Sequence, residues 1–415
     1  MSTLSPQKPD PYGYDFAPVE PEIDEDMMDN WTYYQKLCYS QNPPVPVLSA
    51  MKPLCDGSEY SAKFKHYKIG KHIDIILQVL LRLKTISELD LCDNGLGDTC
   101  IDPLVELIKN SDNLSSLDLS NNTHIRSKAM TQILEGLSES KALESLNISN
   151  TGCMLLGKAL ATVVQNCYTL QNIYLSNCGL GNSVIDFAKA IPMGQKLRML
   201  DLSANRLHTG GKKLALTLGQ NIAKSSTITI VNLSKNALTS EQTISLLRPL
   251  ADSPHLKTLD LSGNSIGDEA GRSISNFITK AAHLKHLDIS GNPVLNVTIN
   301  YSKLKSAQAD DKDKNQANKK DKKPKDPVPG AFLILNACGK SGSLKDIKMI
   351  GLVTRMTDWK NRVDAVQEQN QKLKVLYTSE MSAAYDFRHG NEDPLPEDLP
   401  VQARPQTAQP AKTTR

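Results

Sequence analysis

The sequence of 415 residues has no run of about 18 apolar residues, so it encodes no helix that would span a bilayer. Its first residues, MSTLSPQKPDPYGY, lack the apolar stretch of a signal peptide. The eight cysteines form no C-x-x-C pair and no metal-ligand spacing. These absences predict a cytoplasmic protein with free thiols in a reducing compartment, no membrane partner and no bound metal.

Catalytic motifs are equally scarce. The chain contains no G-x-x-x-x-G-K-[ST], no H-E-x-x-H and no G-x-S-x-G, and its eight histidines are scattered. The formal net charge of +3 is too small to indicate a nucleic-acid-binding surface by itself. We therefore expect no enzymatic activity, no cofactor, no small-molecule substrate and no nucleic-acid partner.

What the chain does have is a repeat. The stretch LKTLDLSGNSIGDEAG, residues 256–271, follows the spacing L-x-x-L-x-L-x-x-N and continues with residues that open a helix. Eight copies of this spacing have starts 27–31 residues apart. They begin at Ile86, Leu114, Leu143, Leu170, Leu197, Ile228, Leu256 and Leu284. A fixed period of this length is typical of a solenoid, in which each unit buries its apolar face against its neighbours.

The spacing is that of leucine-rich repeats, and repeats of this length with helices resemble the ribonuclease-inhibitor class. The resemblance implies an α/β fold, a curved horseshoe with a parallel sheet on the concave face and helices on the convex face. In L-x-L both apolar residues point into the core and the residue between them points outward. The Asn offers donors and an acceptor to a buried turn. We expect Thr151 and Cys178 to fill part of that role in two copies.

The repeats define one domain at residues 33–352. Residues 60–70 fit a degenerate capping repeat, and residues 344–352 fit one more repeat after a polar insertion at about 301–330, so we expect ten strands. Three flanking segments differ from the repeats in composition. They are an acidic, Pro-rich extended or disordered segment (1–32), an amphipathic helix (353–390) and a Pro-rich flexible tail (391–415).

The insertion is rich in lysine. Its clustered lysines are Lys319, Lys320, Lys322, Lys323 and Lys325. The composition favours a solvated loop. The alternative is an electrostatic tether to an acidic surface, for example the acidic tails of tubulin.

Residues 357–377 place apolar side chains at alternating intervals of four and three, which predicts a helix with one apolar seam. The seam consists of Trp359, Val363, Val366, Asn370, Leu373 and Tyr377. Two interpretations are open, because terminal repeats need caps. The helix covers the open end of the last repeat, or its apolar side chains bind a partner helix.

The residue between the paired leucines is acidic in five copies. These outward acids are Asp90, Asp118, Asp201, Asp260 and Asp288. A column of acids invites a basic partner, but D-x-S after the strand is also common scaffold in this repeat class. Tyr174 and Met199 depart from the pattern, and we expect them to contact a partner because aromatics and Met are enriched in interface cores.

The segment before the first repeat carries a narrower resemblance. Its pattern Y-x-x-x-C-x(5)-P-x-x-x-L, at Tyr34, Cys38, Pro44 and Leu48, resembles ciliary leucine-rich repeat proteins, among them a subunit of the nexin–dynein regulatory complex. The resemblance implies a scaffold in a cilium or flagellum, part of a microtubule-associated axonemal complex and in contact with its subunits.

The alternative function is that of the Ran GTPase-activating proteins, which resemble these repeats and carry an acidic tail. It would use loop residues near Asn94–Asp98 or Asn122. Here the tail is Pro-rich and ends with Lys412 and Arg415, so that resemblance stops at the horseshoe.

Overall fold

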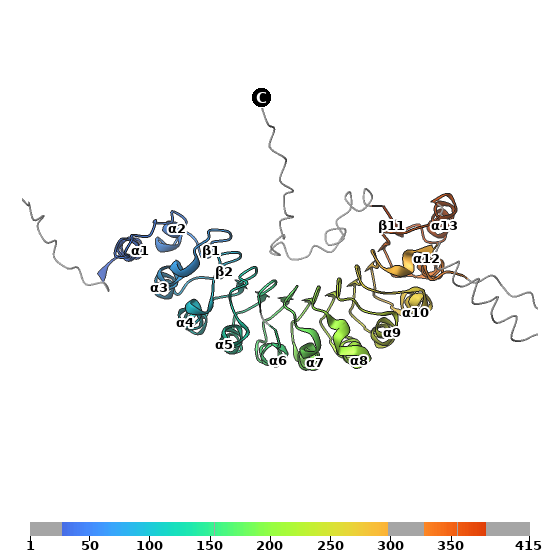
Figure 1. Ribbon diagram of the computed structural model, residues 1–415, viewed down its shortest axis with the longest axis horizontal. Helices are drawn as coiled ribbons and strands as arrows, with labels where there is room; N and C mark the ends of the chain where they lie inside the picture. Colours follow the sequence, from blue (N-terminus) through green and yellow to red (C-terminus); the bar gives the residue numbers. More distant parts are fainter. Residues whose placement is uncertain (1–26, 153, 298–327, 355, 379–415) are drawn as a thin grey trace, which may run out of the picture.

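The computed structural model describes residues 27–152, 154–297, 328–354 and 356–378. Over these residues the chain forms one parallel sheet of eleven strands, paired in the order of the sequence. The strands line the inner side of an arc and the helices lie on its outer side (Figure 1). This is the curved leucine-rich repeat architecture that the spacing predicted.

Each strand has three residues, and in the repeats the central residue is the first leucine of L-x-L. The strands are β1 (Ser61–Lys63), β2 (Glu88–Asp90), β3 (Ser116–Asp118), β4 (Ser145–Asn147), β5 (Asn172–Tyr174), β6 (Met199–Asp201), β7 (Ile230–Asn232), β8 (Thr258–Asp260), β9 (His286–Asp288), β10 (Asp346–Lys348) and β11 (Lys374–Leu376). Central residues pair with each other across strands, for example Leu89 with Leu117 and Leu117 with Leu146. The predicted register is therefore correct, and these leucines are buried.

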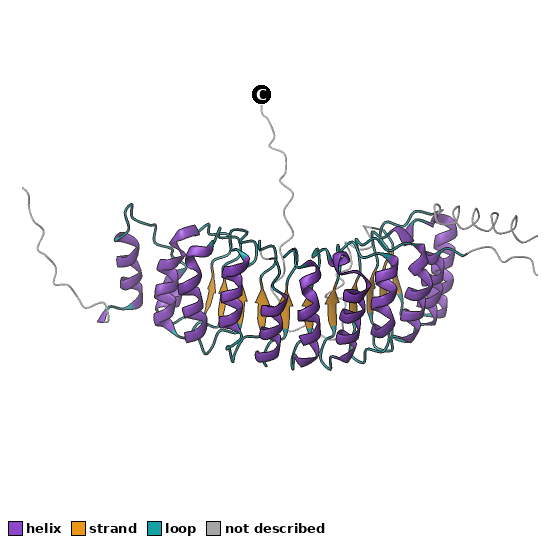
Figure 2. Ribbon diagram, turned by 60° about the horizontal axis from the view of Figure 1, so that its bottom comes forward, coloured by secondary structure: helices purple, strands orange, loops and turns teal. Residues whose placement is uncertain are grey.

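The outer layer consists of one helix per repeat, seen in front of the strands in Figure 2. The α-helices are α1 (Asn30–Tyr39), α2 (Met51–Cys55), α3 (Ile73–Leu83), α4 (Ile101–Asn110), α5 (Ser127–Leu137), α6 (Gly157–Asn166), α7 (Val184–Ala190), α8 (Gly211–Lys224), α9 (Ser240–Leu250), α10 (Gly271–Lys280), α12 (Gly330–Lys340) and α13 (Met356–Gln369). Several begin or end in short 3₁₀ turns. These are η2 (Gly70–His72), η3 (Asp98–Cys100), η4 (Gly181–Ser183), η5 (Ile191–Met193), η6 (Leu207–Gly210), η7 (Asp268–Ala270) and η8 (Pro293–Leu295). Among the described residues, none of the helices is long and apolar enough to cross a membrane.

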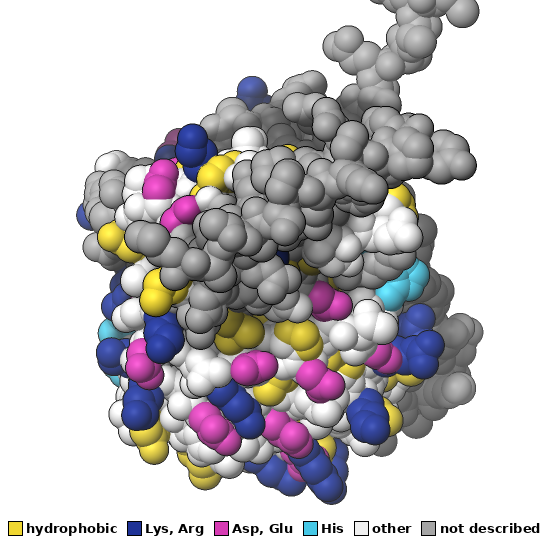
Figure 3. Space-filling view, turned by 90° about the vertical axis from the view of Figure 1, so that its left-hand side faces the viewer, with side chains coloured by type: hydrophobic (Ala, Val, Ile, Leu, Met, Phe, Trp, Pro, Cys, Tyr) yellow, Lys and Arg dark blue, Asp and Glu magenta, His cyan; other side chains and the backbone are white. Residues whose placement is uncertain are grey.

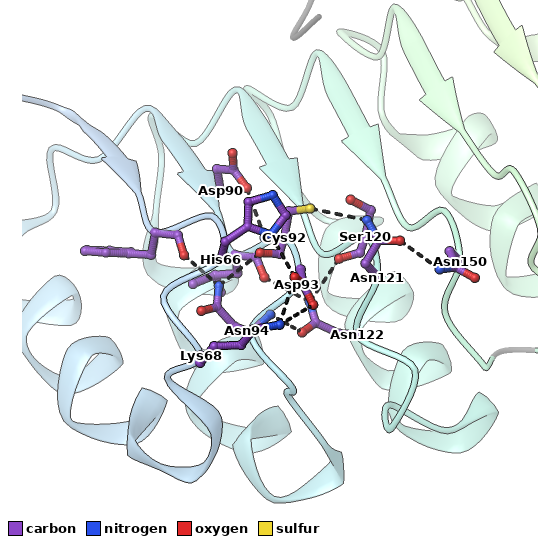
Figure 4. Close-up of polar contacts among 12 residues, drawn as sticks. His66, Lys68, Asp90, Cys92, Asp93, Asn94, Ser120, Asn121, Asn122 and Asn150 are labelled. Atoms are coloured by element: carbon purple, nitrogen blue, oxygen red, sulfur yellow. Dashed lines mark hydrogen bonds and ion pairs between the residues drawn. The ribbon is translucent and has the colours of Figure 1, made fainter. Parts of the chain in front are cut away.

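Asparagines join neighbouring repeats inside the stack. The Asn122 Oδ1 accepts the backbone N–H group of Asn94 at 3.0 Å (Figure 4). The same oxygen accepts the Leu96 N–H (3.1 Å), and the Asn122 Nδ2 donates to the carbonyls of Leu91 and Leu119 (2.9 Å each). One side chain thus satisfies four backbone groups of two repeats, which is why a buried turn can exist there.

The two copies without this asparagine keep part of its bonding, as predicted. The Thr151 hydroxyl and the Cys178 thiol both donate to the Ile148 carbonyl, at 2.8 and 3.1 Å.

The amino-terminal end is closed by the capping repeat and the two helices before it. Phe64 follows β1 and is fully buried, as its alignment with a repeat leucine predicted. Helix α1 begins at Asn30 and is capped by the Asp29 carboxylate, so the boundary of the extended segment at residue 32 was placed too late. Acidic and basic side chains are interspersed on this end of the molecule (Figure 3), as a solvent-facing cap requires.

The insertion leaves the stack in register. Strand β9 pairs directly with β10, with Leu287 opposite Ile347, although 60 residues separate them in the chain. Helix α12 then packs on α10 so closely that a Cβ on Gly271 would lie 2.3 Å from the Gly330 Cα. Strand β9 and helix α12 thus lie on either side of the segment in which the insertion was predicted. Its lysines, and the tail at 391–415, lie outside the described residues.

The carboxyl-terminal helix is shorter than predicted, and an eleventh strand follows it. Helix α13 ends at Gln369, where the Asn370 side chain donates to the Ser341 carbonyl (3.0 Å) and the chain turns back. Leu373 and Val375 are buried and Lys374 between them is exposed, which is strand alternation. Leu373 and Tyr377 therefore matched the helical spacing by coincidence.

Candidate protein-interaction surface on the concave face

The outward residues of β2 to β9 form one row on the concave face, which we call the acid column. Its members are Asp90, Asp118, Asn147, Tyr174, Asp201, Asn232, Asp260 and Asp288. Each sits beside the next because the strands pair without offset. The row ends with basic residues, Lys63 on β1 and Lys348 on β10.

The first role of the acids is structural. The Asp118 Oδ1 accepts the backbone N–H of Ser120, two residues on, at 2.7 Å. This local bond ends the strand and turns the chain. The same bond is made by Asp90, Asn147, Asp201, Asn232, Asp260 and Asp288, at 2.8–3.0 Å. The sequence signal was the alternation of Asp with Asn in this row, since both side chains accept such a bond.

Tyr174 within the column and Lys348 beside its end lack a side chain that can accept this bond. Behind Tyr174, the Ser176 N–H donates instead to the Ser149 Oγ of the preceding repeat (3.1 Å). Behind Lys348, the Ile350 N–H donates to the Ser290 Oγ (3.0 Å). A serine of the preceding repeat thus replaces the missing acceptor, and neither Tyr174 nor Lys348 makes the turn bond.

Burial raises the pKa of three acids in the column, Asp118, Asp260 and Asp288. Burial is the main cause that raises the pKa of Asp288 to about 6, and repulsion by the neighbouring Asp260 is the second cause. Hydrogen bonds from Ser290 and attraction by Lys348 lower this pKa but do not offset the rise. Burial also raises the pKa of Asp260 and of Asp118, although hydrogen bonds from the serines that follow lower both. The column is therefore less strongly charged in mildly acidic solution than its composition suggests.

The structure brings only some of the predicted site residues together. Tyr174 and Asp201 are opposite each other on β5 and β6, and Met199 lies at the other end of β6. Asp201 and Met199 are each only 8% exposed. The seam of α13 lies elsewhere, at the end of the array. Trp359, Val363 and Val366 are buried.

The buried seam of the carboxyl-terminal helix is therefore not presented to a partner beside the concave column. Trp359 stacks on Phe332 of α12 with ring centroids 5.9 Å apart and meets Tyr377 edge-on at 6.5 Å. Leu373 is buried as well. The apolar seam is occupied by the last repeat, as in the capping interpretation.

A cluster of polar groups that the sequence did not single out lies on β2 and β3. Possible metal-ligand atoms of Asp90, Cys92 and Asp118 all lie within 4.8 Å of one another. Figure 4 shows Asp90 and Cys92 of this cluster. Both carboxylates already accept turn amides, and Asp118 also accepts the Asn147 Nδ2 at 2.8 Å. These bonds account for the cluster as part of the scaffold, and we assign no metal to it.

Comparison with known proteins agrees with the repeat architecture. The Leucine Rich repeat family profile matches residues 252–275 and 280–296. Tonsoku-like protein of Mus musculus is 31% identical over 202 residues, 45% of this chain, and that of Bos taurus is 30% identical over 144 residues, 32% of it. The matched regions span only 14% and 10% of those two proteins.

Two solved structures resemble the chain weakly. They are an internalin of Listeria monocytogenes (13% identity, 85% of this chain and 94% of that one, TM-score 0.39) and the repeat protein LegL7 of Legionella pneumophila (17%, 67% and 88%, TM-score 0.38). Repeat spacing, sheet topology and the matched profile together make this chain a leucine-rich repeat protein. The axonemal resemblance of residues 34–48 has no counterpart in the names of these proteins.

Proposed function

We propose that the protein is a non-enzymatic scaffold that binds other proteins on its concave face, with Tyr174 at the centre of the binding surface. The repeats share one continuous core from Tyr34 to Val375, which gives the concave face a fixed shape. A repeat array of this kind is typical of binding modules.

Tyr174 is the observation that carries the proposal. Every other member of the acid column accepts the backbone N–H two residues on, so its identity is explained by the scaffold. Tyr174 does not make this turn bond, because the Ser149 Oγ accepts the Ser176 N–H instead. A half-buried aromatic between Asn147 and Asp201 offers apolar area and a hydroxyl to a partner.

We infer more narrowly, from the lead-in pattern, a place in an axonemal complex of a cilium or flagellum on microtubules. In the structure the lead-in has a packing role: the Tyr34 hydroxyl accepts the Leu48 N–H (3.1 Å), and Tyr34 and Cys38 are buried. The axonemal part therefore rests on the resemblance. Co-purification with detergent-extracted axonemes, and absence from the soluble fraction, would support it.

Two candidate residues of the Ran-type alternative are inaccessible. Asn94 and Asn122 are fully buried in the asparagine ladder, and the Asp98 Oδ1 accepts the Arg126 N–H (2.8 Å). A GTPase could not reach the two asparagines without opening the stack. The proposed scaffold should leave the rate of GTP hydrolysis by Ran unchanged.

The binding proposal is tested with Tyr174→Ala against Tyr168→Ala, an exposed tyrosine in the loop before the same strand. A partner identified by cross-linking should bind the wild type and Tyr168→Ala equally. It should bind Tyr174→Ala at least tenfold more weakly, with no loss of melting temperature in either variant. Equal binding by both variants would show that the partner does not contact the concave face around Tyr174.

A further inference from the structure

A groove of about 850 Å³ runs along the edge of the sheet where β5 to β9 begin. Five of its eleven lining residues are Lys, Arg or His, and none is Asp or Glu. The basic residues are Lys196, Arg198, His255, Lys257 and His283. The sequence analysis did not find this basic groove, because its residues come from loops of four repeats.

Backbone hydrogen bonds fix the strand starts from which Arg198 and Lys257 extend. The Arg198 N–H donates to the Gln171 carbonyl (2.8 Å), and the Arg198 carbonyl accepts the Thr229 N–H (2.9 Å). The Thr229 carbonyl in turn accepts the Lys257 N–H (2.8 Å). The Thr227 Oγ1 further ties the adjoining loop to the Leu197 carbonyl (2.7 Å). A binding site whose backbone is ordered beforehand loses little entropy when a ligand arrives.

The basic character is regional and is not demanded by the repeat. Earlier repeats have Ser87, Ser115 and Glu144 at the position of Arg198, and their backbone groups make the same bonds. Later repeats have Arg198, Thr229, Lys257, Lys285 and Lys345. The strand-to-strand bonds at this position are made by the backbone, so they do not explain the change from neutral and acidic to basic residues.

We propose that the groove binds an acidic, extended segment of a partner protein. Arg198 and Lys257 stand at the starts of strands two apart, which separates them by about 10 Å. Carboxylates on alternate residues of an extended peptide recur every 7 Å or so and can follow such a row. The inference rests on the proposed binding function and adds the chemistry of the partner.

The surroundings favour a peptide over nucleic acid. Asp201 lies three residues along the strand from Arg198, and Asp260 three from Lys257, or about 10 Å in each case. A duplex laid on the groove would bring its second row of phosphates over these acids. No Phe, Tyr or Trp lines the groove to stack on the bases of a single strand.

The test uses a fluorescein-labelled deca-glutamate peptide and anisotropy in about 50 mM salt, where screening is weak. The full-length triple variant Lys196→Gln/Arg198→Gln/Lys257→Gln should bind it at least tenfold more weakly than the wild type. The matched control, Lys109→Gln/Lys128→Gln/Lys158→Gln, removes the same charge from exposed positions on α4, α5 and α6 and should change the Kd less than twofold. Both variants should melt as the wild type does.

Equal weakening in the two triple variants would show attraction to net charge alone and overturn the proposal. Tighter binding of a ten-residue oligothymidylate than of deca-glutamate would also overturn it, in favour of nucleic acid. If the peptide fails to bind while the Tyr174→Ala experiment still shows a concave partner, the groove proposal fails and the scaffold function stands.

Discussion

The acid column and the row of basic residues in the groove both cross the same strands, about three residues apart along each strand. They differ in what their side chains do. In the acid column, the Asp260 carboxylate accepts the Ser262 N–H at 2.8 Å. This bond requires an acceptor at the position and does not require a charge. Along the basic groove, the strand-to-strand bonds at Arg198 and Lys257 are made by the backbone, and any residue type at these positions would make them. The comparison teaches that in a repeat protein the frequent charge belongs to the scaffold, and the irregular charge is the better guide to binding.

The largest effect should come from breaking the core on which both rows stand. Leu259 is fully buried at the centre of β8. Leu259→Asp would place an unpaired charge in a core shared with β7 and β9, so neighbouring repeats should unfold together. Circular dichroism should show loss of helix well beyond one repeat. A melting curve close to the wild type would contradict the shared core.

The next effect concerns the carboxyl-terminal end of both rows. Trp359 is fully buried against Phe332, so Trp359→Ala should destabilise the last repeats by about 3–5 kcal/mol. Its indole N–H has no hydrogen-bond partner among the described residues, so Trp359→Phe should lose much less. Urea denaturation measures both. Lost partner binding with an unchanged denaturation curve would instead mean that α13 is a docking helix.

A smaller effect sharpens the structural role of the acids. Asp260→Ala leaves the Ser262 N–H without its acceptor and should cost about 1 kcal/mol. Asp260→Asn keeps the bond, as Asn147 and Asn232 do at equivalent positions, and should be as stable as the wild type or more. Urea denaturation at pH 7 separates the two variants. Equal destabilisation by Asp260→Ala and Asp260→Asn would show that the position requires the charge and not the hydrogen bond.

The smallest effect is a dependence on pH. The pKa of Asp288 is raised to about 6 in the fold, whereas an unfolded Asp has a pKa near 4. Between these values the unfolded chain ionises first, so the free energy of unfolding should fall as the pH rises from about 4 to about 6 and then level off. In Asp288→Asn this fall should be smaller. An identical pH profile in both proteins would exclude Asp288 as its source.

The sequence was sufficient for the solenoid, because its period and its L-x-L pairs depend on local geometry that every repeat must satisfy. It failed at β11, where Leu373 and Tyr377 fit a helical interval as well as a strand. It also left the role of the acids ambiguous. The sequence D-x-S is the same whether the Asp118 carboxylate accepts the Ser120 N–H or faces a partner.

The basic groove could not be predicted from local pattern alone. Lys196 and Lys257 are 61 positions apart in the chain and lie in one groove only because the strands stack without offset. Aligning the repeats and following the position three before the acid column would have shown the row that leads from Glu144 through Arg198 to Lys345. The strand register shows which residues far apart in the chain lie side by side.

The central claim is that the two rows divide structure and binding between them, and two variants measured in parallel test it most directly. Arg198→Gln should weaken deca-glutamate binding several-fold and leave the melting temperature unchanged. Asp260→Ala should lower the melting temperature by about 2 °C and not weaken peptide binding. The reverse pattern, with Arg198→Gln unfolding at lower temperature and Asp260→Ala losing the peptide, would contradict the account.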